Sequence, residues 1–302
     1  MKNSLKIAIL SYRSAPFGGG QGIYVYELSK TLKQLGHQVD IISGPPYPEL
    51  IPGIKLIKLP GLNLFSTFKF RDRLDLFLNK KNKSFDDWYE FSSTLLGGFP
   101  ELQTFGNRAH SYLLDKTYDV VIDNQSISYG AVKIQDSFPL VEMMHHPISK
   151  DYYYDLKFAK GILQRISKIR WYSFLKMQKI SAKKINVIVT PSVNSKADIH
   201  IDFKVPMENI QVIPNGIDCD IFCPLPHILS KKHRLITTAS ADVPLKGLDF
   251  LLEAIARLKP EYPDIHLMVI GSPRKEGHTE RLIKKLELEK HVSFKTNLTK
   301  EE

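Results

Sequence analysis

Short apolar runs alternate along the chain with longer segments whose apolar residues recur at helical spacing. Runs at Lys6–Ser11 and Gln38–Ser43 predict buried strands, and the segment between them predicts a helix over Ile23–Leu35. Gly36 suits the end of that helix, because glycine adopts left-handed backbone without strain. Further strands are predicted at Gly53–Leu59, Asp119–Asp123, Pro139–Met144, Asn186–Thr190 and Ile210–Ile213, and further helices at Ser84–Leu96, Asn107–Lys116 and Asp151–Lys184. Strands that alternate with helices predict a doubly wound parallel sheet.

The strand–helix pattern restarts after a segment that contains Pro224 and Pro226. We expect a first domain over residues 1–218, a linker over 219–230 and a second domain over 231–302, each of them α/β and Rossmann-like. A cleft between two such domains is a natural ligand site, since ligands bind beyond the carboxyl ends of the strands. The second domain is predicted to hold strands at Leu235–Ser240, Ile265–Gly271 and His291–Lys295, and helices at Lys246–Leu258 and Thr279–Glu289.

The predicted second domain is short. Three strands in about 70 residues compare with the five or six strands of a common doubly wound sheet. The last four residues, Thr299–Glu302, have the T-x-x-E form of a capping box, which normally starts a helix. We therefore expect the second domain to be incomplete and the chain to stop within it.

Composition narrows the class of protein. A length of 302 residues fits two domains, and 43% hydrophobic with 25% charged residues excludes a disordered, collagen-like or coiled-coil chain. The net charge of +10 favours an anionic partner, which includes phosphate, a nucleotide, nucleic acid or an acidic membrane surface.

Targeting and metal-binding signals are weak. No stretch approaches 18 consecutive apolar residues, and Ile7–Leu10 is too short for a secretory signal, so we expect a cytoplasmic location. Cys219 and Cys223 lie in one segment with no second pair, which predicts neither a zinc site nor a disulfide framework.

Two loops that precede helices could bind phosphate. Gly18–Gly22 follows the first strand, and its backbone N–H groups could approach an anion at a helix N-terminus. The dehydrogenase pattern G-x-G-x-x-G fails here because its third glycine is replaced by Ile23, and a purely structural tight turn stays open as an interpretation. Lys246 and Gly247 begin the first helix of the second domain, where a lysine suits a diphosphate. The Walker A pattern is absent, which argues against a P-loop nucleoside triphosphatase.

Four motifs in this order carry a resemblance to a known family. They are Gly19–Gly20, Val25–Leu32 with Gly36–Val39, Val212–Asp218 and Lys246–Ala254. The chain resembles the family-4 retaining glycosyltransferases of the GT-B fold. The resemblance implies two Rossmann-like domains, a nucleotide-sugar donor held mainly by the C-terminal domain and an acceptor held mainly by the N-terminal domain. It also implies transfer with retention at the anomeric carbon, without a required metal or other cofactor.

The resemblance assigns roles to residues of the first domain. Gly19 and Gly20 match the glycine loop that faces the donor phosphates and the acceptor. His145 matches a histidine that contacts the transferred sugar, although the adjacent His146 is an alternative and both could simply end a strand. Asn215, in the Val212–Asp218 motif, is assigned to substrate binding by the same resemblance.

In the second domain the resemblance places Lys246 and Gly247 at the donor diphosphate. A fixed cation is most effective where charge develops on the leaving group. Ser240 occupies the position six residues before the lysine, where the family usually has an arginine, so a charge-assisted contact worth about 1.5–3 kcal/mol is missing there or supplied elsewhere. The family's pair of glutamates that holds the donor ribose and sugar falls beyond residue 302. We expect this to weaken the activity of the chain on its own.

Two stretches are both basic and aromatic. Phe68–Phe85 is one, and Leu156–Lys184 is the other, with nine Lys or Arg residues and no acid. A basic amphipathic helix can lie on an anionic bilayer, which would suit a lipid or cell-envelope acceptor and peripheral contact with the inner face of the membrane. The alternative is a solvated helix face beside the core. Nucleic-acid binding is not expected, because no recognised module accompanies the charge.

Two other function classes are compatible with the sequence. One is a non-catalytic remnant that binds an acceptor or partner through its first domain. The other is a sugar-nucleotide epimerase of the GT-B fold. The order of the glycine loop, the Pro-Asn-Gly-Ile-Asp segment and the Lys-Gly pair favours a glycosyltransferase over an epimerase.

Overall fold

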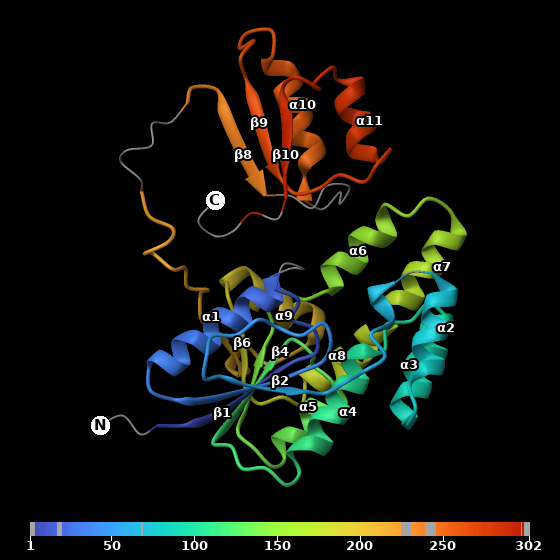
Figure 1. Ribbon diagram of the computed structural model, residues 1–302, viewed down its shortest axis with the longest axis vertical. Coiled ribbons are helices and arrows are strands. Elements are labelled where there is room, and N and C mark those ends of the chain that lie inside the picture. The colour runs from blue at the N-terminus through green and yellow to red at the C-terminus, as the bar shows by residue number, and fades with distance from the viewer. Residues whose placement is uncertain are drawn as a thin grey trace. The chain divides into compact units, whose positions relative to one another are not determined.

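The computed structural model describes residues 4–16, 20–67, 69–224, 231–238, 246–296 and 298. The chain divides into two compact units, Met1–Asn215 (unit 1) and Gly216–Glu302 (unit 2) (Figure 1). Both are built from parallel strands connected by helices, so the predicted α/β fold is confirmed.

Unit 1 contains a seven-stranded parallel sheet in the order β3-β2-β1-β4-β5-β6-β7. The strands are β1 (Lys6–Ser11), β2 (Gln38–Ser43), β3 (Lys55–Lys58), β4 (Val120–Asn124), β5 (Leu140–Met143), β6 (Ile188–Thr190) and β7 (Ile210–Val212). Each predicted strand is present, with bounds within two residues of those expected. The chain runs outward from β1 in one direction and from β4 in the other, so the strand order reverses between these two neighbours.

Helices cover both faces of this sheet. They are α1 (Gly20–Gln34), α2 (Phe70–Asn79), α3 (Phe85–Leu95), α4 (Glu101–Leu113), α5 (Tyr129–Gln135), α6 (Ser149–Lys157), α7 (Ile162–Trp171), α8 (Leu175–Ala182) and α9 (Val193–Phe203). Successive residues of β1 face opposite sides, as the pleat requires. Ile7 and Ile9 pack with Val25 of α1, whereas Ala8 and Leu10 join a larger cluster under α4, α5, α8 and α9.

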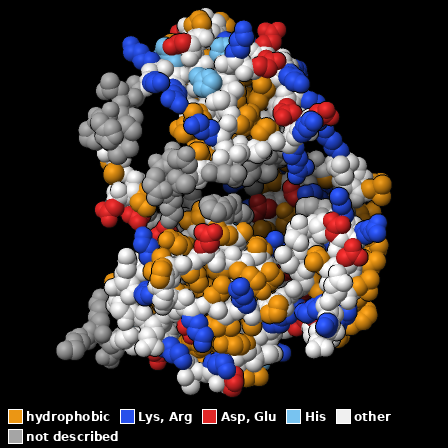
Figure 2. All heavy atoms as spheres, viewed as in Figure 1, with side chains coloured by type: hydrophobic (Ala, Val, Ile, Leu, Met, Phe, Trp, Pro, Cys, Tyr) orange, Lys and Arg blue, Asp and Glu red, His pale blue; other side chains and the backbone are white. Residues whose placement is uncertain are grey.

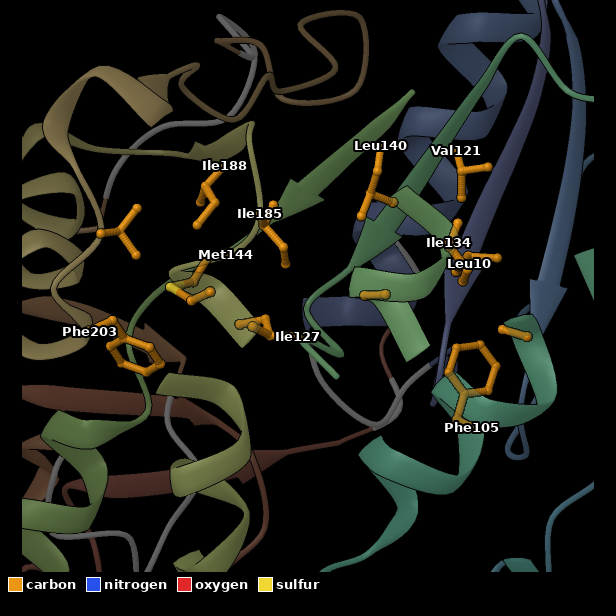
Figure 3. Close-up of a cluster of buried hydrophobic side chains, with 14 of the residues drawn as sticks. Leu10, Phe105, Val121, Ile127, Ile134, Leu140, Met144, Ile185, Ile188 and Phe203 are labelled. Carbon is orange, nitrogen blue, oxygen red and sulfur yellow. The ribbon is translucent and has the colours of Figure 1, made fainter. Parts of the chain in front are cut away.

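The larger cluster is the main core of unit 1. Figure 3 shows Leu10, Val121 and Leu140 of the strands close to Ile134 of α5 and Phe105 of α4. All of these side chains are buried. Strands that are buried on both faces consist largely of consecutive apolar residues. Short apolar runs in the sequence therefore predicted their positions.

Several helices differ from the sequence prediction. The single helix expected over Asp151–Lys184 is divided into α6, α7 and α8, because Gly161 adopts φ +87° and a 3-10 turn at Tyr172–Phe174 redirects the chain. Helix α1 begins at Gly20 rather than Ile23, and α4 begins at Glu101, six residues before the predicted start. Helices α2, α5 and α9 were not expected, since polar residues interrupt their apolar spacing or their length is short.

Unit 2 has a three-stranded parallel sheet in the order β10-β9-β8 among the residues that the structure describes. Its elements are β8 (Arg234–Thr238), α10 (Leu248–Leu258), β9 (His266–Ile270), α11 (His278–Lys285) and β10 (Val292–Lys295). The two helices lie on the same side of the sheet (Figure 1). Leu252 and Ile255 of α10 pack there on Leu267 and Val269 of β9. The predicted helix start at Thr299–Glu302 lies outside the described residues.

Candidate active site

Polar side chains gather where β1, β4 and β5 end. Ser11 is the last residue of β1, Asn124 is the last residue of β4, and His145 lies two residues after β5. Because the strands are parallel, their carboxyl ends meet at one edge of the sheet. The strand order reverses between β1 and β4, and such a switch point is where open α/β sheets bind ligands.

His145 is held in one orientation by a short hydrogen-bond chain. Its Nε2 lies 2.9 Å from Oδ1 of Asn124, and Nδ2 of Asn124 donates to Oγ of Ser11 at 3.4 Å. This second contact orients the amide, so Oδ1 faces the imidazole and Nε2–H donates to it. Burial, and to a lesser extent the neighbouring His146, lower the pKa of His145 to about 4. The ring is therefore neutral near pH 7, and its Nδ1 carries a lone pair that can accept a hydrogen bond.

Helix α1 lies against this histidine. The Tyr24 ring meets the His145 ring edge-on, with the ring centroids 4.5 Å apart. Burial raises the pKa of Tyr24 to about 12, so its hydroxyl stays protonated. Tyr24 is one turn beyond Gly20, and residues four apart share a helix face. Tyr24 therefore brings the first turns of α1 into contact with His145 at the strand ends.

The two described glycines of the predicted loop have different surroundings. A Cβ on Gly22 would lie 2.3 Å from the backbone oxygen of Ala15, so this glycine allows the helix to pack closely on the preceding loop. A Cβ on Gly20 would have nothing within 4 Å. The first turn of α1 carries no acidic residue, and the N–H groups of a helix N-terminus favour an anion. Gly19 lies outside the described residues.

The other predicted residues of unit 1 lie apart from this network. His146 is exposed over 54% of its side chain, and its Nε2 is 3.0 Å from Oδ2 of Asp151 in the first turn of α6. Asn215 is exposed at the last residue of unit 1. Of the two adjacent histidines, only His145 joins the hydrogen bonds at the strand ends.

The candidate diphosphate residues of unit 2 stand at the start of α10. Lys246 is exposed, and Gly247 caps the helix with φ +70°, a left-handed conformation that favours glycine. Asp249 in the first turn pairs with Nε2 of His278 at 2.8 Å. Ser240 lies outside the described residues.

Sequence reasoning missed Asn124, Ser11 and Tyr24. A usable signal existed for the first two, because both are polar residues at the carboxyl end of a predicted apolar strand. Tyr24 carried none, since an aromatic residue in an amphipathic helix usually packs in the core. Within the described residues, no group of three or more His, Cys, Asp or Glu side chains is placed to hold a metal ion.

Comparison with protein families gives two matches. Residues 18–221 match the model described as Glycosyltransferase Family 4, and residues 226–302 match the model described as Glycosyl transferases group 1. A protein from Mycolicibacterium hassiacum named MMP alpha-(1->4)-mannosyltransferase is 39% identical over 302 residues, which are 99% of this chain and 72% of that protein. The chain belongs to the GT-B glycosyltransferases.

Solved structures agree on the fold of this glycosyltransferase. WaaG, described as a glycosyltransferase involved in lipopolysaccharide biosynthesis, aligns with a TM-score of 0.62 at 17% identity, over 97% of this chain and 70% of WaaG. TarM aligns with a TM-score of 0.61 at 12% identity, over 98% of this chain and 77% of TarM. In addition, no helix among the described residues is long and apolar enough to cross a bilayer.

Proposed function

We propose that this glycosyltransferase moves a mannosyl unit from a nucleotide-sugar donor to a sugar hydroxyl, with retention at the anomeric carbon, as a member of the retaining family 4. The M. hassiacum relative supports both the sugar and an α-(1→4) linkage through its name. Nucleotide-activated mannose is α-linked, so an α-linked product corresponds to retention. The sequence resemblance points in the same direction.

The observation that carries the proposal is the neutral, oriented His145. With Nε2–H donating to Asn124, the Nδ1 lone pair is the group available to accept a hydroxyl of the transferred sugar. Glycosyl transfer develops positive charge at the anomeric carbon and its ring oxygen. A protonated imidazole nearby would raise the free energy of that transition state, whereas a neutral acceptor does not. The low pKa of His145 therefore suits its proposed role.

The proposed partners of the donor diphosphate in unit 2 are Lys246 and Gly247, with Ser240 six residues earlier in the sequence. In unit 1 they are Gly20 at the start of α1 and, by the sequence resemblance alone, Gly19. Lysine and helix N-terminal N–H groups both stabilise negative charge, and the charge on the diphosphate grows as it leaves. The resemblance supports neutralisation by these groups without a bound metal.

Gly20 offers a clean test of the donor site. Because a Cβ there meets nothing within 4 Å, Gly20→Ala should leave the melting temperature equal or slightly higher, since alanine favours a helix over glycine by about 0.5–1 kcal/mol. If the donor diphosphate approaches this backbone, the added methyl group should weaken binding of GDP-mannose by about tenfold, or about 1.4 kcal/mol. Isothermal titration calorimetry with GDP-sugars and with UDP-sugars measures the affinity of the native protein and of the variant.

The matched control is Thr31→Ala, which places alanine at another exposed position of α1. Equal donor affinity in the two variants would reduce the glycine loop to a structural turn and remove α1 from the donor site. A weakened Gly20→Ala variant beside an unchanged Thr31→Ala variant supports the proposal.

The same enzyme could act on a membrane-bound acceptor, and one surface favours this. Helices α6 and α7 bury no residue, whereas α8 is largely in the core, so the basic stretch divides into an exposed part and a structural part. Ile162 and Leu163 at the start of α7 are 76% and 84% exposed. Phe65 joins this surface to α2, since its ring contacts both Trp171 and the guanidinium of Arg73.

We define the α6–α7 surface by its exposed apolar and basic residues. They are Phe158, Ile162, Leu163, Ile166 and Ile169 with Lys157, Lys160, Arg165 and Arg170. Figure 2 shows hydrophobic and basic side chains together along the edge that α2 and the α6–α7 turn form. We propose that this surface binds an anionic bilayer beside a lipid-linked or cell-envelope acceptor. Apolar side chains that enter the interface and lysines that attract anionic headgroups act together there.

Vesicle binding checks this surface. Binding to vesicles that contain anionic lipid should exceed binding to neutral vesicles and should fall as salt is added. Leu163→Ser should reduce partitioning about tenfold, because burial of a leucine side chain is worth about 1.5–3 kcal/mol. Leu114→Ser, an exposed leucine after α4, is the control and should change little. Equal partitioning to both kinds of vesicle would instead identify a solvated helix face.

A further inference from the structure

Two buried carboxyl groups lie side by side beneath the candidate site. Asp123 of β4 and Glu142 of β5 are register partners in the parallel sheet, and both are fully buried. Neighbouring strands are about 4.8 Å apart, so partner side chains on one face are in contact. Asp123 directly precedes Asn124, and Glu142 lies three residues before His145. The pair therefore belongs to the two strands that deliver the hydrogen-bonded site residues.

The two carboxyl groups hold a proton between them. Burial and the charge of Asp123 raise the pKa of Glu142 well above its ordinary value, and burial raises the pKa of Asp123 to about 6. Among the described residues, no lysine or arginine pairs with either group. Two adjacent carboxylates without a cation cannot both ionise at low cost. Glu142 therefore stays protonated and donates to Asp123.

The environment of the pair is otherwise poor in donors. Apart from the proton that the pair shares, both side-chain oxygens of Glu142 and Oδ1 of Asp123 lack a hydrogen-bond donor of good geometry in the described chain. The N–H groups of Gln125 and Ile127 lie near Glu142 but outside that geometry. Leaving a buried polar atom unsatisfied costs about 1–3 kcal/mol. The shared proton, together with the hydrogen bond that Ser126 Oγ donates to Asp123 Oδ2, therefore stabilises this arrangement.

The loop after β4 has an unusual backbone and a hydrogen bond to Asp123. Gln125 and Ile127 adopt φ of +66° and +46°, and a β-branched residue such as Ile127 rarely occupies the left-handed region. Such residues cost about 1–3 kcal/mol and persist where the surroundings fix them. Oδ2 of Asp123 accepts a hydrogen bond from Oγ of Ser126, and Ile127 is buried in the core (Figure 3). Gln178 of α8 donates to the Ser126 carbonyl at 3.4 Å.

We propose that Asp123 and Glu142, sharing one proton, hold the Gln125–Ile127 loop in its strained shape and thereby fix Asn124 as the hydrogen-bond partner of His145. Both acids are positioning residues, because they act through Asn124 and touch no substrate. Their contribution to glycosyl transfer rests on the function proposed above. Asn124 lies between the strand and the strained loop, so a change of backbone at Gln125 would turn its amide away from the imidazole.

Two substitutions of Glu142 distinguish the effect of the shared proton from the effect of the side-chain volume. Glu142→Gln keeps the shape and an N–H donor for Asp123. Glu142→Leu fills similar space without a donor, so Asp123 loses its partner. Selective ¹⁵N-histidine NMR reports the His145 ring directly. We expect the Nε2–H tautomer to persist in Glu142→Gln, because Asn124 Oδ1 still faces Nε2. In Glu142→Leu we expect the Nε2–H and Nδ1–H tautomers to mix, because Asn124 no longer holds one of them.

Kinetics and stability complete the test. Glu142→Leu should lower kcat for mannosyl transfer at least tenfold with little change in the donor KM, and kcat of Glu142→Gln should stay within about threefold of that of the native enzyme.

Native Glu142 keeps a proton that the unfolded chain loses near pH 4.5. The stability of the native protein relative to Glu142→Gln should therefore decline as pH rises from there toward the folded-state pKa, because the folded state binds more protons.

If Glu142→Leu does not fold, Ser126→Ala removes the Ser126 donor to Asp123 and should shift the His145 signals in the same direction. A folded Glu142→Leu or Ser126→Ala variant with native His145 signals overturns the proposal. Shifted signals with unchanged kcat support the positioning role but contradict the function proposed for His145, so the two failures are distinguishable.

Discussion

Replacing Gly130 with alanine should destabilise unit 1 by about 3 kcal/mol or more, near the upper end of the range for overpacked sites. Helices α4 and α5 meet backbone to backbone at this point. A Cβ on Gly130 would lie 2.1 Å from the backbone oxygen of Gly106 and 2.7 Å from its Cα. Backbone atoms cannot move aside as a flexible side chain can, so the two helices must separate.

That separation would open the main core, because Phe105 of α4 and Ile134 of α5 belong to it. We expect the melting temperature to fall by about 6–12 °C, at about 2–4 °C per kcal/mol for a domain of this size. Differential scanning calorimetry measures the change. Gly20→Ala is the matched control, since its Cβ has open space. A Gly130→Ala protein that melts within 2 °C of this control would contradict the close helix contact.

The second large effect is expected at Lys246. If its ammonium group neutralises the departing diphosphate, Lys246→Ala should reduce the rate of transfer by about 10²-fold, the scale for one contact that strengthens in the transition state. Lys246→Arg keeps the positive charge but changes its geometry. Its rate of transfer should therefore lie between those of the native enzyme and Lys246→Ala. Initial rates with UDP- and GDP-sugars and candidate sugar acceptors provide the measurement.

The control for Lys246 is Lys290→Ala, which removes another exposed lysine of unit 2. Both substitutions lower the net charge of the protein by one, so general electrostatic attraction of an anionic donor changes equally. A rate for Lys246→Ala equal to that for Lys290→Ala would exclude Lys246 from the donor site. A loss confined to Lys246→Ala would support the role that its position at the start of α10 suggests.

Local sequence located the strands well. The central strands of unit 1 are largely buried on both faces, so a short apolar run suffices to mark them, as in Lys6–Ser11. The predicted start of the helix at Ser84 is close to the observed one, because the Ser84 side chain caps α3 and Asp87 completes the capping box. The ordered motifs carried the glycosyltransferase resemblance, and the family matches confirm a glycosyltransferase. The roles given to His145 and Lys246 stay predictions.

Helix bounds were harder, because they depend on contacts beyond the segment itself. The apolar and basic pattern over Asp151–Lys184 continues across Gly161, and only the packing of α8 in the core shows that the chain must turn there. The sequence predicts Gly22 in the loop Gly18–Gly22, before the helix. In the structure it lies within α1, because the helix packs too closely on Ala15 for a side chain.

The sequence by itself determined the fold class, the strands and a pair of adjacent histidines at the end of β5, because these depend on neighbours along the chain. Tertiary structure alone decided which histidine joins the site. His145 meets Asn124 and Tyr24, which are 21 residues away in β4 and far earlier in α1, while His146 faces Asp151. Strand register likewise places Asp123 beside Glu142. Register and helix docking are set by the packing of the whole core, and no local pattern encodes them.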